Sequence, residues 1–164
     1  MPKHTLSAFL VCATALLAGC GEAEQPKAAA PPPERGIFIS ATDCGASGKI
    51  TAELCGQAID MAVAVHEQQA PVYKTLRQCQ AAEGPERCDK TVDGQYRARL
   101  QAFFVTMSDP PSALPLYPSM QGQIGFRQAT RQAVDARDEN INVSIAALTL
   151  ANENAKLPNP LAAE

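Results

Sequence analysis

The sequence predicts a small α-rich domain stapled by disulfide bonds, with an α+β arrangement as the alternative. Apolar residues recur at three- and four-residue steps between Thr51 and Gln69, which is typical of an amphipathic helix. Four cysteines, an even number, follow a segment with the features of an export signal, so two disulfides are expected. We therefore expect a helical hairpin, one or two short strands and a C-terminal helix, carried on a flexible tether.

The first 19 residues have the three parts of a secretory signal peptide. Lys3 lies in a short polar start, and an apolar run follows from Leu6 to Ala18. This run of about 13 residues is too short to span a membrane as a helix, which takes about 20. In Leu17-Ala18-Gly19-Cys20, small residues precede a cysteine whose thiol can take a diacylglyceryl group. Residues 1–19 are therefore expected to be a lipoprotein signal peptide, with Cys20 lipidated. The alternative is an ordinary secretory signal with an incidental cysteine.

Residues 20–36 are expected to connect the lipid to the folded part of the chain. They contain almost no large apolar side chain, and their proline run favours polyproline II. At about 3.1 Å per residue, such a tether could hold the domain up to roughly 50 Å from the bilayer. A tail with no spacing role fits the same residues. Beyond it we expect a four-cysteine domain at 37–126, a C-terminal amphipathic segment at 127–156 and a tail at 157–164.

The four-cysteine domain is expected to begin with a strand and a long helix. Ile37–Thr42 has strand composition, and Asp43–Gly48 has the composition of a loop. Thr51 is a suitable N-cap for a helix that runs to about Gln69. Pro71 ends that helix or starts the next, because the residue before a proline avoids the helical region.

A second, shorter amphipathic segment begins at Val72 and stops at Gly84, which completes the expected helical hairpin. Tyr96–Met107 is ambiguous, because its apolar spacing fits a helix while its centre has strand composition. The proline-rich stretch Asp109–Pro118 is expected to be an extended loop, since proline disrupts regular structure.

The segment 127–156 is expected to form an amphipathic helix, on which Arg131 and Asp135 could pair at i and i+4. Several asparagine, serine and threonine residues weaken this helical propensity. The alternation of Ile141, Val143 and Ile145 would fit a strand instead.

Composition limits the classes of partner. The chain has 14 Lys+Arg against 17 Asp+Glu, for a net charge of −3, and loss of Lys3 with the signal makes the mature chain more acidic. Because there is no basic stripe, nucleic acid is not expected as a partner. The overall charge also gives no reason to expect electrostatic attraction to anionic lipid headgroups; the membrane is expected as a partner through the lipid on Cys20.

The cysteine count agrees with export. Cys12 leaves with the signal and Cys20 carries the lipid, so an even set remains in a chain bound for an oxidising compartment. A zinc site is the weaker alternative, because the spacings are wide and His66 is the only histidine in the mature chain. Two disulfides are expected among the remaining residues Cys44, Cys55, Cys79 and Cys88.

Two pairings of these cysteines are considered. Local pairing joins Cys44 to Cys55 and Cys79 to Cys88, with an intervening glycine in each loop to reverse the backbone. Nested pairing joins Cys55 to Cys79 and Cys44 to Cys88 across the hairpin. The nested arrangement leaves an offset of about 9 Å along two helical arms, whereas cysteine Cα atoms must come within about 7 Å. Local pairing is therefore favoured.

About half of the chain resembles the YgiB-like bacterial lipoproteins, a family of uncharacterised envelope proteins. The resemblance rests on a four-cysteine frame with His, Ala-Pro and Tyr between the pairs, followed by an aromatic-Pro-x-Met-x-Gly element. It implies an envelope lipoprotein of unknown function and supplies no catalytic residue. The matching residues are Asp43-Cys44, Cys55, His66, Ala70-Pro71, Tyr73, Cys79, Gly84, Cys88 and Tyr117-Pro118-Ser119-Met120-Gln121-Gly122.

Few residues suggest chemistry. His66 could be a general base or a pH sensor, but a packing histidine near a helix end is favoured. Phosphate-binding loops, nucleophile motifs and metal-ligand pairs are absent from the sequence, so neither a catalytic residue nor a metal or cofactor is expected. An interaction surface is considered, although packing of the loop around Tyr117 onto the hairpin is favoured. The candidates are His66, Tyr73, Tyr117, Met120 and Phe126.

These observations lead to a functional expectation. We expect a lipid-anchored envelope protein, not an enzyme, with a structural or protein-interaction role and an unidentified envelope protein as partner. The domain is expected to face the periplasm. Gly21 and Glu22 lack the aspartate linked to inner-membrane retention, which favours the outer membrane. The alternative is an envelope enzyme, or an inhibitor of one, that uses His66 or the Tyr117–Phe126 loop.

Overall fold

The computed structural model describes residues 31–119 and 123–156. All described helices and strands belong to the second of the two units into which the chain divides, Met1–Pro31 and Pro32–Glu164. The expected signal peptide, Cys20, most of the tether, Met120 and the tail lie outside the described residues. No helix in the described part of the chain is long and apolar enough to cross a membrane.

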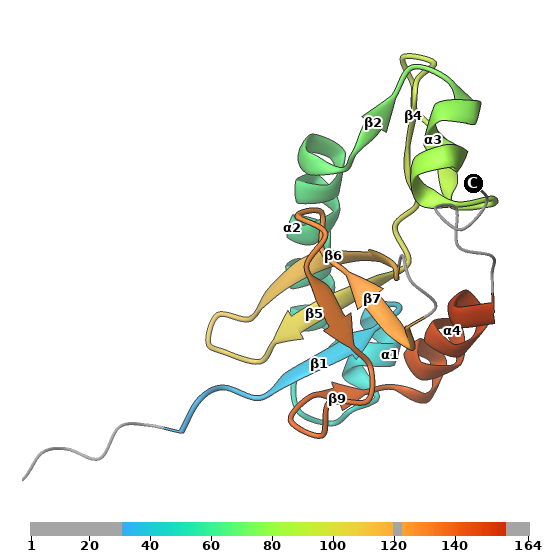
Figure 1. The fold of residues 1–164 in the computed structure, drawn as a ribbon. Helices are drawn as coiled ribbons and strands as arrows, with labels where there is room; N and C mark the ends of the chain where they lie inside the picture. The colour runs from blue at the N-terminus through green and yellow to red at the C-terminus, as the bar shows by residue number, and fades with distance from the viewer. Residues whose placement is uncertain (1–30, 120–122, 157–164) are drawn as a thin grey trace, which may run out of the picture. The chain divides into compact units, whose positions relative to one another are not determined.

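The described residues contain both helices and strands, which alternate along the chain (Figure 1). The helices are α1 (Ala41–Gly45), α2 (Ala52–Gln69), α3 (Leu76–Glu83) and α4 (Ile145–Lys156). The strands are β1 (Arg35–Phe38), β2 (Val72–Tyr73), β3 (Cys88–Lys90), β4 (Tyr96–Ala98), β5 (Ala102–Thr106), β6 (Ser112–Pro118), β7 (Gly125–Arg127), β8 (Ala133–Asp135) and β9 (Asn142–Val143).

The fold is α+β, so the expectation of an α-rich domain is wrong. Of the described residues, 35% are helical and 26% lie in strands. A curled six-stranded sheet has the order β8-β7-β6-β5-β1-β9, and a three-stranded sheet has the order β2-β4-β3. Most pairs are antiparallel, while β1 and β9 are parallel. The prediction of one or two strands was too low. Most of the strands are only two to five residues long, which is too short for a clear alternating pattern in the sequence.

Side chains that alternate along the strands place helices on both faces of the six-stranded sheet. Phe38, Phe103 and Val105 pack on one face in a cluster with residues of α1 and α2. Ile37 and Ala102 point to the other face, in a cluster with residues of α4. The sheet is therefore the central layer, with α1 and α2 on one side and α4 on the other.

Helix α2 begins and ends where its local sequence predicts. The Thr51 hydroxyl accepts a hydrogen bond from the amide of Leu54 at 3.2 Å, so Thr51 is the N-cap. The helix stops at Gln69, two residues before Pro71. These bounds confirm the expected helix.

The expected helical hairpin does not form. Val72 and Tyr73 form β2, and Thr75 caps a shorter helix that ends at Gly84. Helix α3 packs against β2, β3 and β4, whereas α2 packs against α1, β5 and β6. Both apolar helix faces are therefore buried against strands, so neither requires the other helix.

The first strand and the following loop also differ from expectation. Strand β1 ends at Phe38, before the expected end at Thr42, because Ser40 caps helix α1, which occupies the end of the expected strand and the start of the expected loop. The Ser40 hydroxyl accepts a hydrogen bond from the Asp43 amide at 3.1 Å. The ambiguous stretch Tyr96–Met107 contains two strands, β4 and β5.

The proline-rich stretch Asp109–Pro118 is not an extended loop, because Ser112–Pro118 forms β6 in the middle of the sheet. Strand β5 pairs with β6 from Ser112 to Leu116, but β7 pairs only with Tyr117 and Pro118. Most of β6 is therefore an edge on the β7 side, which is where strands tolerate proline.

The expected helix at 127–156 is wrong over its first half. That half contributes β8 and β9, and only Ile145–Lys156 is helical. Arg131 has a φ of 69° in the turn before β8, which interrupts the helix, and Asp135 pairs with Arg137 at 3.1 Å instead of with Arg131. The alternation expected from Ile141 to Ile145 corresponds to the short strand β9.

Two disulfides join the four cysteines of the domain. Cys44 bonds to Cys55, which links α1 to α2, and Cys79 bonds to Cys88, which links α3 to β3. This is the local pairing that the sequence favours. Each bond therefore holds a short helix to its neighbouring element.

Candidate functional site

The most unusual feature of the described residues is an ion pair inside the fold. Glu83, at the end of α3, accepts a hydrogen bond from Nη2 of Arg127, which lies in β7. Each side chain is only 2% exposed. Burial of charges is unfavourable unless they are paired and hydrogen-bonded, so the pair requires further partners around it.

Those partners extend the ion pair into a polar network of five residues. The Tyr73 hydroxyl donates a hydrogen bond to Oε1 of Glu83. The Arg127 guanidinium lies over the ring of Tyr117, 5.1 Å from its centre, in a cation–π contact. The Tyr117 hydroxyl is hydrogen-bonded to Nδ1 of His66 at 3.0 Å. The polar network therefore connects α2, β2, α3, β6 and β7, and so joins the small sheet to the large one.

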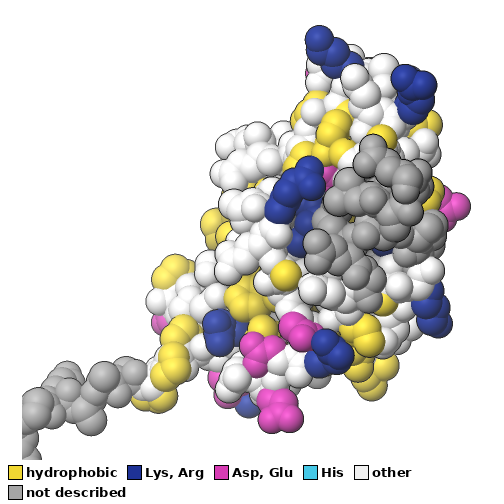
Figure 2. Space-filling model, viewed as in Figure 1, with side chains coloured by type: hydrophobic (Ala, Val, Ile, Leu, Met, Phe, Trp, Pro, Cys, Tyr) yellow, Lys and Arg dark blue, Asp and Glu magenta, His cyan; other side chains and the backbone are white. Residues whose placement is uncertain are grey.

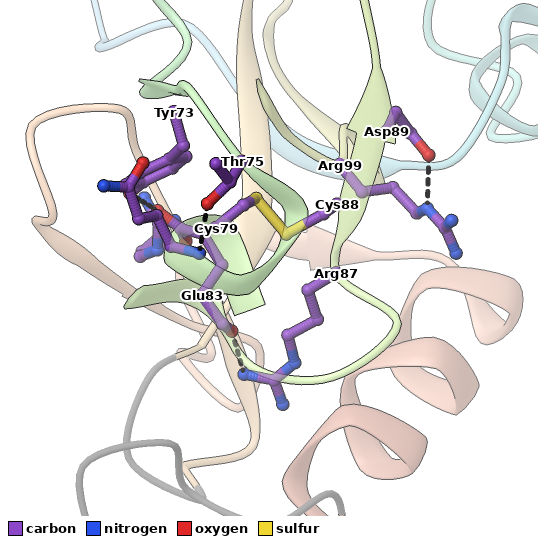
Figure 3. Close-up of a disulfide and its surroundings, with 10 residues drawn as sticks. Tyr73, Thr75, Cys79, Glu83, Arg87, Cys88, Asp89 and Arg99 are labelled. Carbon is purple, nitrogen blue, oxygen red and sulfur yellow. Dashed lines mark hydrogen bonds and ion pairs between the residues drawn. A yellow bond between two sulfur atoms is a disulfide. The ribbon is translucent and has the colours of Figure 1, made fainter. Parts of the chain in front are cut away.

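A second buried arginine holds the ends of two helices. Arg87, which is 3% exposed, donates to the carbonyl of Glu83 in the last turn of α3 and to that of Asn154 in the last turn of α4. It also donates to the Ser119 carbonyl at 2.9 Å. Because the carbonyl end of a helix carries partial negative charge, two helix ends compensate the charge of this guanidinium. Figure 3 shows Arg87 directed to the Glu83 end of α3, while Asp89 and Arg99 pair on the other side of β3.

Burial shifts the pKa values in and around the polar network. Desolvation raises the pKa of Tyr73 to about 12, assisted by its hydrogen bond to Glu83, and raises that of Tyr117 to about 12. Desolvation, and secondly the positive charge of Arg127, lowers the pKa of Arg87. Burial, and secondly the charge of Arg97, lowers the pKa of His66. Both phenols therefore stay protonated near neutral pH, and His66 stays neutral.

The network is well suited to holding the structure together. Each of its charged groups bonds to another part of the fold, and both tyrosine hydroxyls are engaged. The Nε atoms of Arg87 and Arg127 are buried with no hydrogen-bond partner among the described residues. Both arginines therefore form their hydrogen bonds through the terminal nitrogens, which bond to residues of other helices and strands.

The residues expected to form an interaction surface are mostly inside the fold. His66 is 6% exposed, Tyr117 is fully buried and Phe126 is 1% exposed. Tyr73 is half-buried, and Met120 lies outside the described residues. The structure brings His66, Tyr73 and Tyr117 together in one network, while Phe126 packs in the cluster beneath α4.

Sequence reasoning missed the three charged residues that organise this region, Glu83, Arg87 and Arg127. Their positions gave no signal, because Glu83 sits at the end of one expected amphipathic segment and Arg127 at the start of another. Only the pairing of β7 with β6 places Arg127 beside Tyr117.

The described residues also form an open groove beside the N-terminus of α4, with a volume of about 580 Å³. Its polar centre is Asp43, whose Oδ2 accepts hydrogen bonds from the Ile39 amide at 2.9 Å and the Ser144 hydroxyl at 2.6 Å. Ser144 in turn caps α4 by accepting from the Ala147 amide at 3.0 Å. Both polar side chains are thus engaged in holding α1 to α4. Among the described residues, no group of three or more His, Cys, Asp or Glu side chains could hold a metal ion.

These features define the class of this protein, which is a small α+β domain with two short-range disulfides and a buried polar network. The chain matches the family described as "Protein of unknown function (DUF1190)" over residues 33–143, and it belongs to that family. The match covers both disulfides and all five residues of the polar network. No curated protein and no solved structure gives a significant match.

Proposed function

We propose that this protein is a lipid-anchored protein of the bacterial envelope with a structural or protein-interaction role. The observation that carries the proposal is the division of the six cysteines. Cys12 and Cys20 lie in and directly after a signal-like segment, and the other four are joined in two disulfides. Disulfides persist in oxidising compartments, and a cysteine that follows Leu-Ala-Gly is suited to lipidation.

The boundary between tether and domain supports this organisation. The folded unit begins at Pro32 and the family match begins at residue 33, both after the proline-rich run has started. The connection between a lipid on Cys20 and the domain is therefore shorter than the expected 20–36, because Arg35 and Gly36 already belong to β1. The resemblance to YgiB-like envelope lipoproteins points the same way, and Gly21 and Glu22 favour the outer membrane, with the domain in the periplasm.

A non-enzymatic role is supported by the use that the fold makes of its reactive side chains. His66, the expected candidate for a general base, is buried and bonded to Tyr117. The charges of Glu83, Arg87 and Arg127 are each bonded to another element. Because these groups connect parts of the fold to one another, they are not available for catalysis. The protein would therefore interact through the exposed surfaces of its domain.

The anchor is tested by replacing Cys20 with alanine and following palmitate incorporation and membrane sedimentation in the producing bacterium. We expect Cys20→Ala to lose the label and to leave the membrane fraction. Cys12→Ala is the matched control, because it removes a cysteine from the signal without touching the acceptor, and it should be labelled like the original chain. A Cys20→Ala protein that keeps its palmitate and its membrane attachment would contradict the proposal.

The interaction role is tested by photo-crosslinking in cells. A photoreactive residue placed at Met61, which is 54% exposed on α2, or at Ile145, which is 86% exposed at the start of α4, samples two faces of the domain. The same two variants kept without irradiation serve as the control, because no crosslink can then form. We expect a discrete crosslinked envelope protein from at least one of the two sites after irradiation. Irradiated samples that match the dark controls at both sites would contradict an interaction role.

A further inference from the structure

The small sheet places two turns at the same end. In the register of this sheet, Tyr73 of β2 lies opposite Tyr96 of β4, which lies opposite Lys90 of β3. The chain continues from this row into the β2–α3 connection on one side and into the β3–β4 turn on the other. Figure 1 shows both connections at the end of the small sheet that points away from the six-stranded sheet.

Exposed residues at this end combine positive charge with aliphatic side chains. Val92 in the β3–β4 turn is fully exposed, at 107%, and Leu76 at the start of α3 is 40% exposed. Figure 2 shows Lys and Arg side chains at this end of the molecule, with hydrophobic side chains just below them in the view. We call this set the basic tip; its members are Lys74, Leu76, Arg77, Lys90 and Val92, all of them exposed.

The charge of the basic tip is opposite to that of the whole chain. The chain carries −3, whereas the tip carries three cations, with Asp93 as the acidic residue in the same turn. The nearby Arg97 and Arg99 are neutralised by Glu67 and Asp89. Within residues 31–119 and 123–156, Lys74, Arg77 and Lys90 form no ion pair, so the tip concentrates positive charge in a chain of net negative charge.

The basic tip is also held rigidly. The Thr91 amide donates to the Gln95 carbonyl at 2.9 Å, and the Gly94 amide donates to the Thr91 carbonyl at 3.1 Å with Gly94 at a φ of 83°. The Cys79–Cys88 disulfide joins α3 to β3, two residues before Lys90 (Figure 3). The backbone on both sides of the exposed Val92 is therefore held by hydrogen bonds within the turn.

We propose that the basic tip contacts the anionic phospholipid surface of the membrane that carries the lipid anchor. The inference rests on the proposed lipid on Cys20, because that anchor would hold the domain close to the bilayer, where a basic patch can meet the headgroups. Anionic headgroups attract lysine and arginine, and the aliphatic side chains enter the interface between headgroups and acyl chains. A membrane fits better than an acidic protein, because a protein interface buries about 800 Å² per partner and the five exposed residues of the tip offer much less.

The contact is tested with a tryptophan reporter, since the chain contains no tryptophan. Val92→Trp is introduced into the full lipidated protein, which is bound to vesicles that contain brominated lipid. The vesicles are either phosphatidylcholine alone or phosphatidylcholine with about one-third phosphatidylglycerol. We expect strong quenching of the tryptophan fluorescence only with the anionic vesicles. The matched reporter Ile145→Trp, at another exposed aliphatic position, should be quenched weakly with both.

Charge reversals test the basis of the contact. Lys74→Glu and Lys90→Glu, each in the Val92→Trp protein, should weaken the contact at least about fivefold per removed positive charge. Lys49→Glu is the control, because Lys49 is an exposed lysine of the other part of the domain, paired with Glu34. Far-ultraviolet circular dichroism and intact disulfides verify that each variant is folded.

The two vesicle types separate this inference from the proposed anchor. Flotation of the protein with neutral vesicles measures the lipid on Cys20, whereas quenching by anionic vesicles measures the tip. Flotation without quenching above that of Ile145→Trp would overturn the tip proposal and leave the anchor intact. Quenching that Lys74→Glu and Lys90→Glu leave unchanged would also overturn it. Quenching by anionic vesicles without flotation on neutral ones would support the tip and refute the anchor.

Discussion

Arg127 and Glu83 form an ion pair in which both side chains are 98% hidden from solvent, and it connects strand β7 to helix α3 across 44 residues of sequence. The hydroxyl of Tyr73 and the ring of Tyr117 complete its surroundings. The pair thus lies where the two sheets meet, and each charge is compensated by a group from a different element. This arrangement makes the region sensitive to the loss of any one member.

Removal of both members of this pair should cost less than the two single removals added together. Glu83→Gln leaves Arg127 buried without a counter-charge, so we expect the free energy of unfolding to fall by about 3–5 kcal/mol. The double variant Glu83→Gln with Arg127→Met should lose less than the sum of the two single variants. Urea unfolding of the oxidised protein measures the three values, and additive losses would show that the charges are not coupled.

Arg87 should matter much more than the neighbouring Arg99. Arg87→Met leaves three buried carbonyl groups without a charged donor, so we expect a loss of about 3 kcal/mol and faster hydrogen exchange in the last turns of α3 and α4. Arg99→Met is the matched control, because its ion pair with Asp89 is about half exposed and should change stability by less than about 1 kcal/mol. Equal effects of the two variants would refute the role given to Arg87.

His66 should make the protein less stable in mild acid. Burial lowers its pKa in the folded state below the ordinary value of 6.5, so the unfolded chain binds the proton more readily. The contribution of His66 to stability is therefore complete above pH 6.5 and is lost as the pH falls below that value. Unfolding of the original chain and of His66→Gln is compared across this range. The difference between them should shrink as the pH falls, and a constant difference would contradict the assignment.

The two disulfides should make similar contributions to stability. The paired cysteines are separated by 11 and 9 residues, so loop-closure entropy predicts about 2.5–3 kcal/mol for each bond. They should differ in accessibility, because Cys44, Cys55 and Cys79 are fully buried whereas Cys88 is half-buried. We expect a mild reductant to open Cys79–Cys88 first, as measured by alkylation and peptide mass. Earlier opening of Cys44–Cys55 would contradict this order.

Two glycines should respond to alanine in opposite directions. A Cβ at Gly125 would lie 2.3 Å from the Val134 carbonyl oxygen, so Gly125→Ala should force β7 and β8 apart and cost about 1–3 kcal/mol. At Gly56 in α2 the nearest atom is 3.9 Å away, so Gly56→Ala should stabilise the helix by about 0.5–1 kcal/mol. Thermal unfolding compares both with the original chain. A tolerated Gly125→Ala would show that β8 can move away from β7.

Local chemistry predicted some elements well. Thr51 and Pro71 mark the two ends of α2, because an N-cap hydroxyl and the residue before a proline act on the backbone next to them. Elements that depend on strand pairing with residues distant in the sequence were not predicted. Ser112–Pro118 contains prolines that suggest a loop, and it becomes a strand because β5 lies beside it and most of its other edge is free.

The polar network shows the same difference between features set by neighbouring residues and features set by distant ones. The sequence identified His66, Tyr73 and Tyr117 as candidates for an interaction surface, with packing inside the domain favoured for His66 and for the loop around Tyr117. In the structure they are bonded to one another or to Glu83 and Arg127 in the interior. Charged side chains are normally exposed, so a buried pair between residues 44 positions apart has no local signature.

The sequence by itself determined the span of α2 and a cysteine spacing that favours local disulfides. Each of these depends on residues that are neighbours along the chain. Only the tertiary structure decided that the fold is α+β, that α2 and α3 pack on strands, and that Glu83 meets Arg127. These features depend on strand pairing between distant residues, where the gain from burying a shared face outweighs the propensity of any one segment.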